Sequence, residues 1–198
     1  MAILRKGFKT EANDIAREVR RELGLGLADP LDPWQLAEHL DIPIVPLSSF
    51  KSAAPKAVRH FVHMERQVFS AVTVFSGSAR LIVYNDAHHP GRQRSDLAHE
   101  LSHALLLHPP KPAVDRRGCR DWDSEMEEEA NWLAGALLIS EEAALTIEGR
   151  GMSLDRAARV YGVTRKMVQF RLNVTGAQVR VRRARRALGV GAAVGSRT

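Results

Sequence analysis

Apolar positions along the chain recur at helical spacing in several segments. Residues 10–23 carry them at intervals of three and four, and Gly24 follows. Asp32 followed by Pro33 is typical of a helix N-terminus and predicts a helix to Leu40. The same reasoning predicts four later helices, over residues 95–108, 124–139, 154–161 and 164–172.

Between these helices lie runs rich in β-branched and aromatic residues. They predict strands over residues 58–64, 68–75 and 81–84, with a hairpin connection at Ser76-Gly77-Ser78. Residues 85–94, with Pro90-Gly91, and residues 111–121 are predicted to be loops. A small group of strands followed by helices indicates an α+β fold.

Composition is that of a globular protein, with 44% hydrophobic and 26% charged residues among 198. No apolar run approaches the roughly 20 residues of a membrane helix, and the N-terminus lacks the apolar region of a signal peptide. The single cysteine, Cys119, cannot form an internal disulfide. These features favour a cytoplasmic protein without a membrane partner.

The net charge of +6 is concentrated at the C-terminus. Residues 177–198 hold six arginines and no acidic residue, so the rest of the chain is formally neutral. We expect a flexible basic tail, either solvated without a partner or attracting nucleic acid or an acidic protein. Gly149-Arg150-Gly151 is the best domain boundary, which divides the chain into residues 1–148, 149–176 and 177–198.

The most informative segment is His99-Glu100-Leu101-Ser102-His103. Residues four apart lie on one helix face, so both imidazoles can reach one metal ion, and two such nitrogens suit zinc. Glu100 lies beside them, placed to accept a proton from water. The alternative, a helix whose histidines face solvent, fits poorly with the uncharged residues around them.

A third ligand is predicted in the helix that begins near Ser124. Glu127 and Asn131 share a face there, so Glu127 would bind the metal and Asn131 would hold a histidine's other ring nitrogen. Glu128 and Glu129 are the next candidates. Alternatively, Ser124 and Glu127 form a capping box at the helix start.

Other candidate groups have simpler interpretations. His108 lies off the ligand face and is expected to close the C-terminus of its helix. His88 and His89 could contact substrate from a loop. Cys119 is interpreted as an incidental thiol.

Taken together, these segments resemble the ImmA/IrrE family of zinc metallopeptidases. The resemblance is carried by His99 to His108, by Glu127-Glu128-Glu129-Ala130-Asn131 with the apolar run to Ile139, and by residues 32–38 and 81–85. The chain departs from the family pattern at Ile139-Ser140, where Met-Pro is usual. The interval from His103 to His108 is also one residue longer than the family pattern.

The resemblance implies a zincin-like core, in which a small twisted sheet lies beside two active-site helices. It also implies that Glu127 is the third zinc ligand, as in glutamate zincins, and that the substrate is a helix-turn-helix repressor. From the residues and the resemblance together, we expect a zinc endopeptidase that hydrolyses a regulatory protein, a repressor or an antitoxin.

Residues 154–172 fit a helix-turn-helix, with Gly162 at the turn and Thr164 as the cap of the second helix. Its candidate contacts to DNA or a partner are four polar residues: Arg165, Lys166, Gln169 and Arg171. Alternatively, it is a structural hairpin that packs on the peptidase core. The corresponding rival function is a DNA-binding regulator, or a toxin–antitoxin component, whose metal site does not turn over.

Overall fold

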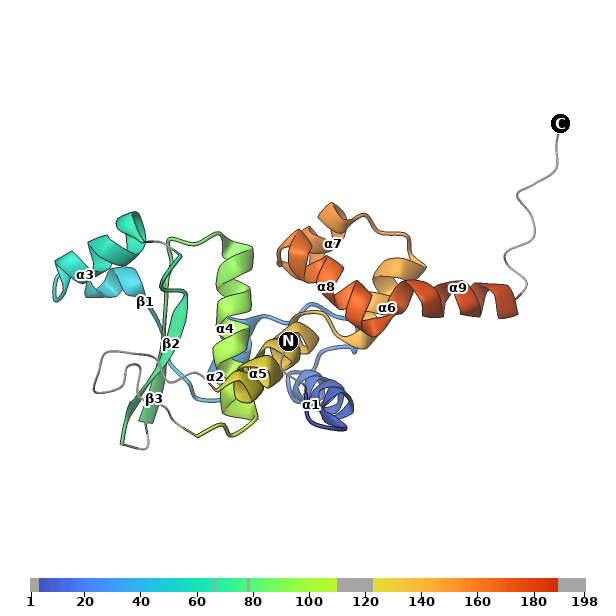
Figure 1. The fold of residues 1–198 in the computed structure, drawn as a ribbon, viewed down its shortest axis with the longest axis horizontal. Coiled ribbons are helices and arrows are strands. Elements are labelled where there is room, and N and C mark those ends of the chain that lie inside the picture. The colour runs from blue at the N-terminus through green and yellow to red at the C-terminus, as the bar shows by residue number, and fades with distance from the viewer. Residues whose placement is uncertain (1–3, 66, 78, 110–122, 189–198) are drawn as a thin grey trace.

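The computed structural model describes residues 4–65, 67–77, 79–109 and 123–188. They form a mixed α+β fold that is mostly helical, with a small three-stranded sheet. In Figure 1 the sheet lies on one side of the long helix α4 (Pro90–Leu105), and the C-terminal helices gather on the other side. None of the helices in the described part of the chain combines the length and apolar character that crossing a bilayer requires.

The main core is built where four helices meet one face of the sheet. Helices α1 (Phe8–Glu22), α2 (Pro33–His39), α4 and α5 (Ser124–Leu138) contribute its buried side chains. Asp32 caps α2 as predicted, accepting a hydrogen bond from the Trp34 backbone N–H at 3.0 Å. The buried guanidinium of Arg20 donates to the Leu137 carbonyl at 2.7 Å and so ties α1 to α5.

The sheet has the order β1-β3-β2, from β1 (Ile44–Pro46), β2 (Ala71–Ser76) and β3 (Ala79–Tyr84). β1 pairs with β3 in parallel, whereas β2 pairs antiparallel, with Thr73 opposite Ile82. Within the described residues β2 is therefore an edge strand. Its alternating side chains place Ala71 in the main core and Val72 in a smaller cluster on the opposite face.

The prediction of a strand over residues 58–64 is wrong. The short 3-10 helix η1 (Leu47–Phe50) is followed by α3 (Pro55–Arg59) and a π-helical turn, η2 (His60–Met64). Pro55 occupies the first helical turn, where its fixed φ is favourable. Val58, Phe61 and Val62 are three and four residues apart, so a helix places them together against the outer face of the sheet.

Helix α4 begins at Pro90, five residues before the predicted start, so part of the predicted 85–94 loop is helical. His89 is the N-cap, and its Nδ1 accepts a hydrogen bond from the Gly91 backbone N–H at 3.1 Å. A Cβ on Gly91 would lie 3.0 Å from the Val163 carbonyl carbon. Pro90-Gly91 therefore starts a helix that packs closely on the C-terminal part of the chain, rather than forming a turn.

The C-terminal part is helical throughout its described length. It comprises α6 (Glu141–Gly149), which the sequence did not predict, α7 (Leu154–Tyr161), α8 (Arg165–Thr175) and α9 (Ala177–Ala187). These helices share a second core with α4 and α5, which includes Ala98, Ala134 and Leu138. This second core therefore contains residues from both sides of the boundary expected at residue 149.

The prediction of a flexible tail from residue 177 is wrong over α9. Ala177 is fully buried, Arg180 forms an ion pair with Glu141, and the Arg185 guanidinium donates to the Gly149 carbonyl at 2.7 Å. These contacts hold α9 against α6, and Figure 1 shows its far end extending away from the rest of the molecule. Residues 189–198, and the loop predicted over 111–121 with Cys119, lie outside the described residues.

Candidate metal centre

The start of α5 leaves Glu127 available to the facing helix. Asp123, rather than Ser124, is the N-cap, and its Oδ1 accepts from the Glu125 and Met126 backbone N–H groups at 3.1 and 3.3 Å. Glu127 is therefore one position beyond the place that a capping box requires. The capping alternative to a role for Glu127 is thus removed.

Helices α4 and α5 pack side by side and bring three potential ligands together. His99 Nε2 lies 3.1 Å from His103 Nε2 and 3.2 Å from Glu127 Oε2, and His103 Nε2 lies 3.7 Å from Glu127 Oε1. One donor atom from each residue fits within 4.8 Å of the others, so the group could hold a metal ion. Each side chain is slightly more than one-fifth exposed, which leaves the group accessible from solvent.

The second ring nitrogen of each histidine has its own partner. His99 Nδ1 lies 3.0 Å from Asn131 Oδ1, one helical turn beyond Glu127. Because an amide oxygen only accepts, His99 donates to it from Nδ1. The Nε2 atom that faces Glu127 therefore carries a lone pair when His99 is neutral and a second N–H when His99 is protonated. His103 Nδ1 lies 2.8 Å from Nδ1 of His108, a contact that the sequence did not predict.

The ionisation of Glu127 and that of His99 influence each other through the contact between the two side chains. Burial opposes ionisation of Glu127, yet the hydrogen bonds from His103 and His99 lower the pKa of its carboxyl group well below the usual range. Burial disfavours the charged form of His99, but the hydrogen bond to Glu127 and the charges of Glu100 and Glu127 raise its pKa. In the absence of a metal, the cluster therefore retains a proton that a metal ion would replace.

Glu100 points from α4 toward the sheet rather than into solvent. It is buried, and its Oε2 accepts a hydrogen bond from the Thr73 hydroxyl at 2.6 Å. Thr73 lies in the middle of β2, so the carboxylate next to the histidines is held by one of the two edge strands of the described sheet. The sequence carried no signal for Thr73, because the contact joins a strand and a helix 27 positions apart.

Glu129 and two further histidine candidates have structural partners. Glu129 pairs with Arg5 at 2.8 Å, while its other oxygen lies 3.6 Å from His108 Nε2. His88 is buried beside Asp96, whose pKa is raised by burial, and His89 caps α4. Neither His88 nor His89 belongs to the cluster.

The candidate contacts in residues 154–172 separate into two groups. Arg165, Lys166 and Gln169 are exposed on α8. Arg171 is only 1% exposed, and its Nε donates to the Ile139 carbonyl at 2.8 Å. The prediction that Arg171 contacts DNA or a partner is therefore wrong, because the side chain is used inside the protein to join α8 to the end of α5.

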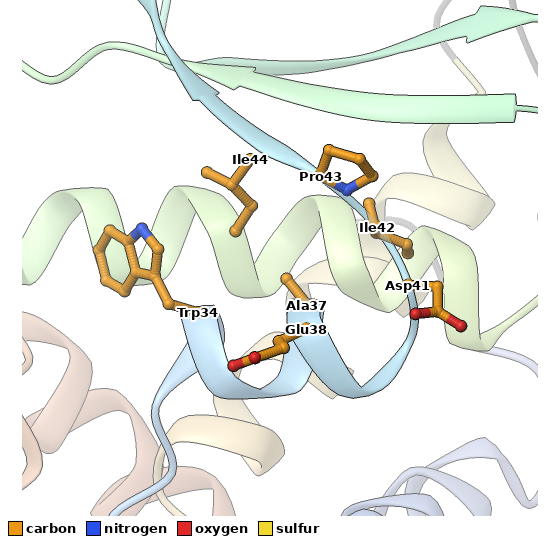
Figure 2. Close-up of a pocket in the computed structure, with 7 residues that line it drawn as sticks. All are labelled: Trp34, Ala37, Glu38, Asp41, Ile42, Pro43 and Ile44. Atoms are coloured by element: carbon orange, nitrogen blue, oxygen red, sulfur yellow. The ribbon is translucent and has the colours of Figure 1, made fainter.

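A separate hollow of about 450 Å³ lies at the opposite edge of the sheet. Figure 2 shows it between α2 and β1, with Trp34 and Ile44 among its lining side chains. Its remaining lining residues are Ala37, Glu38, Asp41, Ile42 and Pro43. No residue of the histidine–glutamate cluster lines it, so it is distinct from the candidate metal centre.

Comparison with known protein families gives a match that includes the candidate metal centre. The family model Peptidase_M78, described as the IrrE N-terminal-like domain, matches residues 37–173. The chain belongs to the Peptidase_M78 family. Among curated proteins, none matches the sequence.

Membership places the chain in a metallopeptidase family, which agrees with the ImmA/IrrE resemblance found in the sequence. The Peptidase_M78 match runs from α2 to α8 and so includes every residue of the candidate metal centre. The matched residues do not include α1 and α9. Ser140, at one departure from the family pattern, caps α6 by accepting from the Ala143 backbone N–H at 3.0 Å.

Proposed function

We propose that the chain is a zinc-dependent endopeptidase of the glutamate-zincin type. His99, His103 and Glu127 would hold the metal and Glu100 would be the catalytic base. The observation that carries the proposal is the convergence of two imidazole nitrogens and one carboxylate beside a buried second carboxylate.

The donor set fits zinc in both type and spacing. Tetrahedral ligands at about 2.0–2.1 Å from zinc are about 3.3 Å apart. The ligand-atom separations of 3.1, 3.2 and 3.7 Å are close to this value. Three protein ligands leave one position open, which is typical of catalytic rather than structural zinc sites.

When bound, zinc would polarise a carbonyl group and make a nearby water molecule more acidic. Glu100 would accept the proton of the attacking water and deliver it to the departing amine. The Thr73 hydroxyl, 2.6 Å from Glu100 Oε2, would hold that carboxylate in one orientation. Asn131 would keep the His99 proton on Nδ1, so that Nε2 remains available to the metal.

An extended substrate segment would add to β2, whose outer edge is unpaired among the described residues. Since Thr73 joins this strand to Glu100, one peptide bond of the added segment would pass beside the base. Following the ImmA/IrrE resemblance, we propose a cytoplasmic regulatory protein as the substrate, namely a helix-turn-helix repressor or an antitoxin.

The decisive experiment mixes the purified protein with the product of the neighbouring gene, with and without a zinc chelator. The wild-type protein should cleave that product only without the chelator. Glu100→Gln should retain zinc and the fold but lose cleavage, because glutamine keeps the shape and lacks the basic oxygen. Cleavage at the wild-type rate by Glu100→Gln would refute the assignment of the base.

A second candidate function is DNA binding through the C-terminal region, with a metal site that does not turn over. The observation in its favour is the set of exposed basic residues on α8 and α9, including Arg165, Lys166, Arg182, Arg183 and Arg186. The turn between α7 and α8 has Gly162 at φ 64° and Thr164 as the cap of α8, consistent with a helix-turn-helix-like unit over residues 149–176.

A further inference from the structure

The C-terminal end of α4 has the hydrogen-bond pattern of a Schellman motif. The Leu107 N–H donates to the Ala104 carbonyl at 3.2 Å, and the His108 N–H donates to the His103 carbonyl at 3.0 Å. The residue between the helix and His108 is Leu107, whose φ is 53°. This left-handed conformation, usually adopted by glycine, reverses the chain so that His108 returns to His103.

A Schellman motif commonly joins its two end residues by an apolar contact. Here the same two positions are occupied by histidines, and the contact is between ring nitrogens, with Nδ1 of His103 2.8 Å from Nδ1 of His108. The His108 side chain is only 10% exposed and its other nitrogen, Nε2, faces Glu129 at 3.6 Å. Glu129 in turn pairs with Arg5, which precedes α1.

We propose that His108 is a positioning residue for the metal ligand His103, and that Glu129 with Arg5 fixes the orientation of His108. The proposal rests on the zinc site described above. A metal ligand that binds through Nε2 must carry its proton on Nδ1, so His103 donates to His108. His108 must then accept at Nδ1 and hold its own proton on Nε2, toward the carboxylate of Glu129.

This arrangement accounts for the left-handed backbone conformation of Leu107. Leu107 itself is 83% exposed and packs against little, so its strained φ is retained for the position of the next residue. Arg5 lies before residues 37–173, so the family match does not include this part of the arrangement.

The experiment measures zinc affinity by chelator competition, together with the melting temperature of the metal-free protein. His108→Ala should bind zinc about 10- to 100-fold more weakly than the wild type, the range typical of partners that orient a metal ligand. His108→Gln should recover part of the loss, because its amide oxygen can accept the His103 proton. Nitrogen chemical shifts of His103 in metal-free protein should report Nδ1 protonation in the wild type and its loss in His108→Ala.

Two matched pairs test the remaining parts of the proposal. Glu129→Gln should weaken zinc binding, whereas Glu128→Gln should leave it unchanged. Leu107→Gly should keep wild-type affinity, and Leu107→Val should lower it, because a β-branched residue disfavours a positive φ.

Equal zinc affinities for the wild type and His108→Ala would overturn the positioning role while leaving the metal site in place. A fall in metal-free melting temperature with unchanged zinc affinity would also overturn it, since His108 would then be structural only. A wild-type protein that binds no zinc would overturn the metal site and the positioning role together.

Discussion

Replacing Arg171 tests how the C-terminal helices are attached to the catalytic region. Its side chain passes between α8 and α5, with its Cδ 3.0 Å from the position of a Cβ on Gly135 and its guanidinium 5.9 Å from the Trp132 ring centre. Nε donates to the Ile139 carbonyl, but neither terminal nitrogen has a hydrogen-bond partner among the described residues. The residue therefore contributes one good hydrogen bond and extensive packing, at the cost of a poorly compensated charge.

These contributions can be compared in magnitude. Burial lowers the pKa of Arg171 to about 10, and this shift from the usual arginine value disfavours the charged form by about 3 kcal/mol. The hydrogen bond from the charged group to Ile139 contributes about 1.5–3 kcal/mol. Arg171→Met keeps the apolar stem and removes both, so its stability should lie within about 1 kcal/mol of the wild type. Arg171→Ala also loses the two buried methylene groups beyond Cβ, at about 0.8 kcal/mol each, and should be about 1.6 kcal/mol less stable than Arg171→Met.

Urea denaturation of the two variants measures this difference directly, with the exposed Arg165→Met as the matched control. The expected order of the free energy of unfolding is Arg171→Met close to wild type and Arg171→Ala clearly below, with the m-value unchanged. Equal stabilities for the Met and Ala variants would show that the side chain is not packed between α5 and α8. A loss of DNA affinity in Arg171→Met without any change in stability would restore Arg171 as a surface contact.

Two further predictions concern the metal centre. Glu127→Ala should weaken zinc binding by more than about 100-fold, the upper limit for residues that only orient a ligand, because a ligand itself is lost. Stoichiometric zinc bound at wild-type affinity would remove Glu127 from the site. The control is Glu125→Ala, at an exposed position of the same helix. Zinc affinity should also rise with pH, by up to about tenfold per pH unit for each proton released, and level off above the raised pKa of His99. Affinity rises with pH because the raised pKa keeps His99 protonated to higher pH, and below that pKa protons compete with zinc for the imidazole. A zinc affinity that stays constant from pH 5 to 8 would contradict this expectation.

Local signals predicted the elements whose ends are marked by specific residues. Asp32 and Thr164 are caps that act on their own neighbours, so each could be recognised without knowing the fold. The spacing of His99 and His103 is likewise a property of a single helix. Their convergence with Glu127 required only that two neighbouring helices pack face to face.

The features that sequence reasoning missed depend on contacts between distant segments. The apolar residues of 58–64 suit a strand or a helix equally well, and packing on the sheet selected the helix. Arg171 lies at a buried position of α8 where an apolar residue would be expected. Its presence there is explained by the hydrogen bond to the carbonyl of Ile139, at the end of α5. The contact between His103 and His108 depends on a positive φ at Leu107, a conformation that a leucine does not announce.

DNA binding by helix α9 is better tested by substitutions than by deleting residues 177–198. Ala177 is buried in the second core, so removing residues 177–198 would expose that core and confuse folding with binding. Arg180 and Arg185 are engaged with α6, so the exposed Arg182, Arg183 and Arg186 are the arginines to replace.

If these three arginines contact phosphates, replacing all of them with glutamine should reduce the slope of log affinity against log salt by about 2–3, since each contact contributes about 0.9. Replacing Lys51, Lys56 and Arg59 makes the same change of charge on exposed positions of the α3 region, at the opposite end of the molecule in Figure 1, and should leave the slope nearly unchanged. The measurement is a DNA titration at several salt concentrations, with zinc content determined for each variant. An equal reduction of the slope in both triple variants would mean that α9 attracts DNA only through net charge. An unchanged slope in both would remove phosphate binding from the functions of this helix.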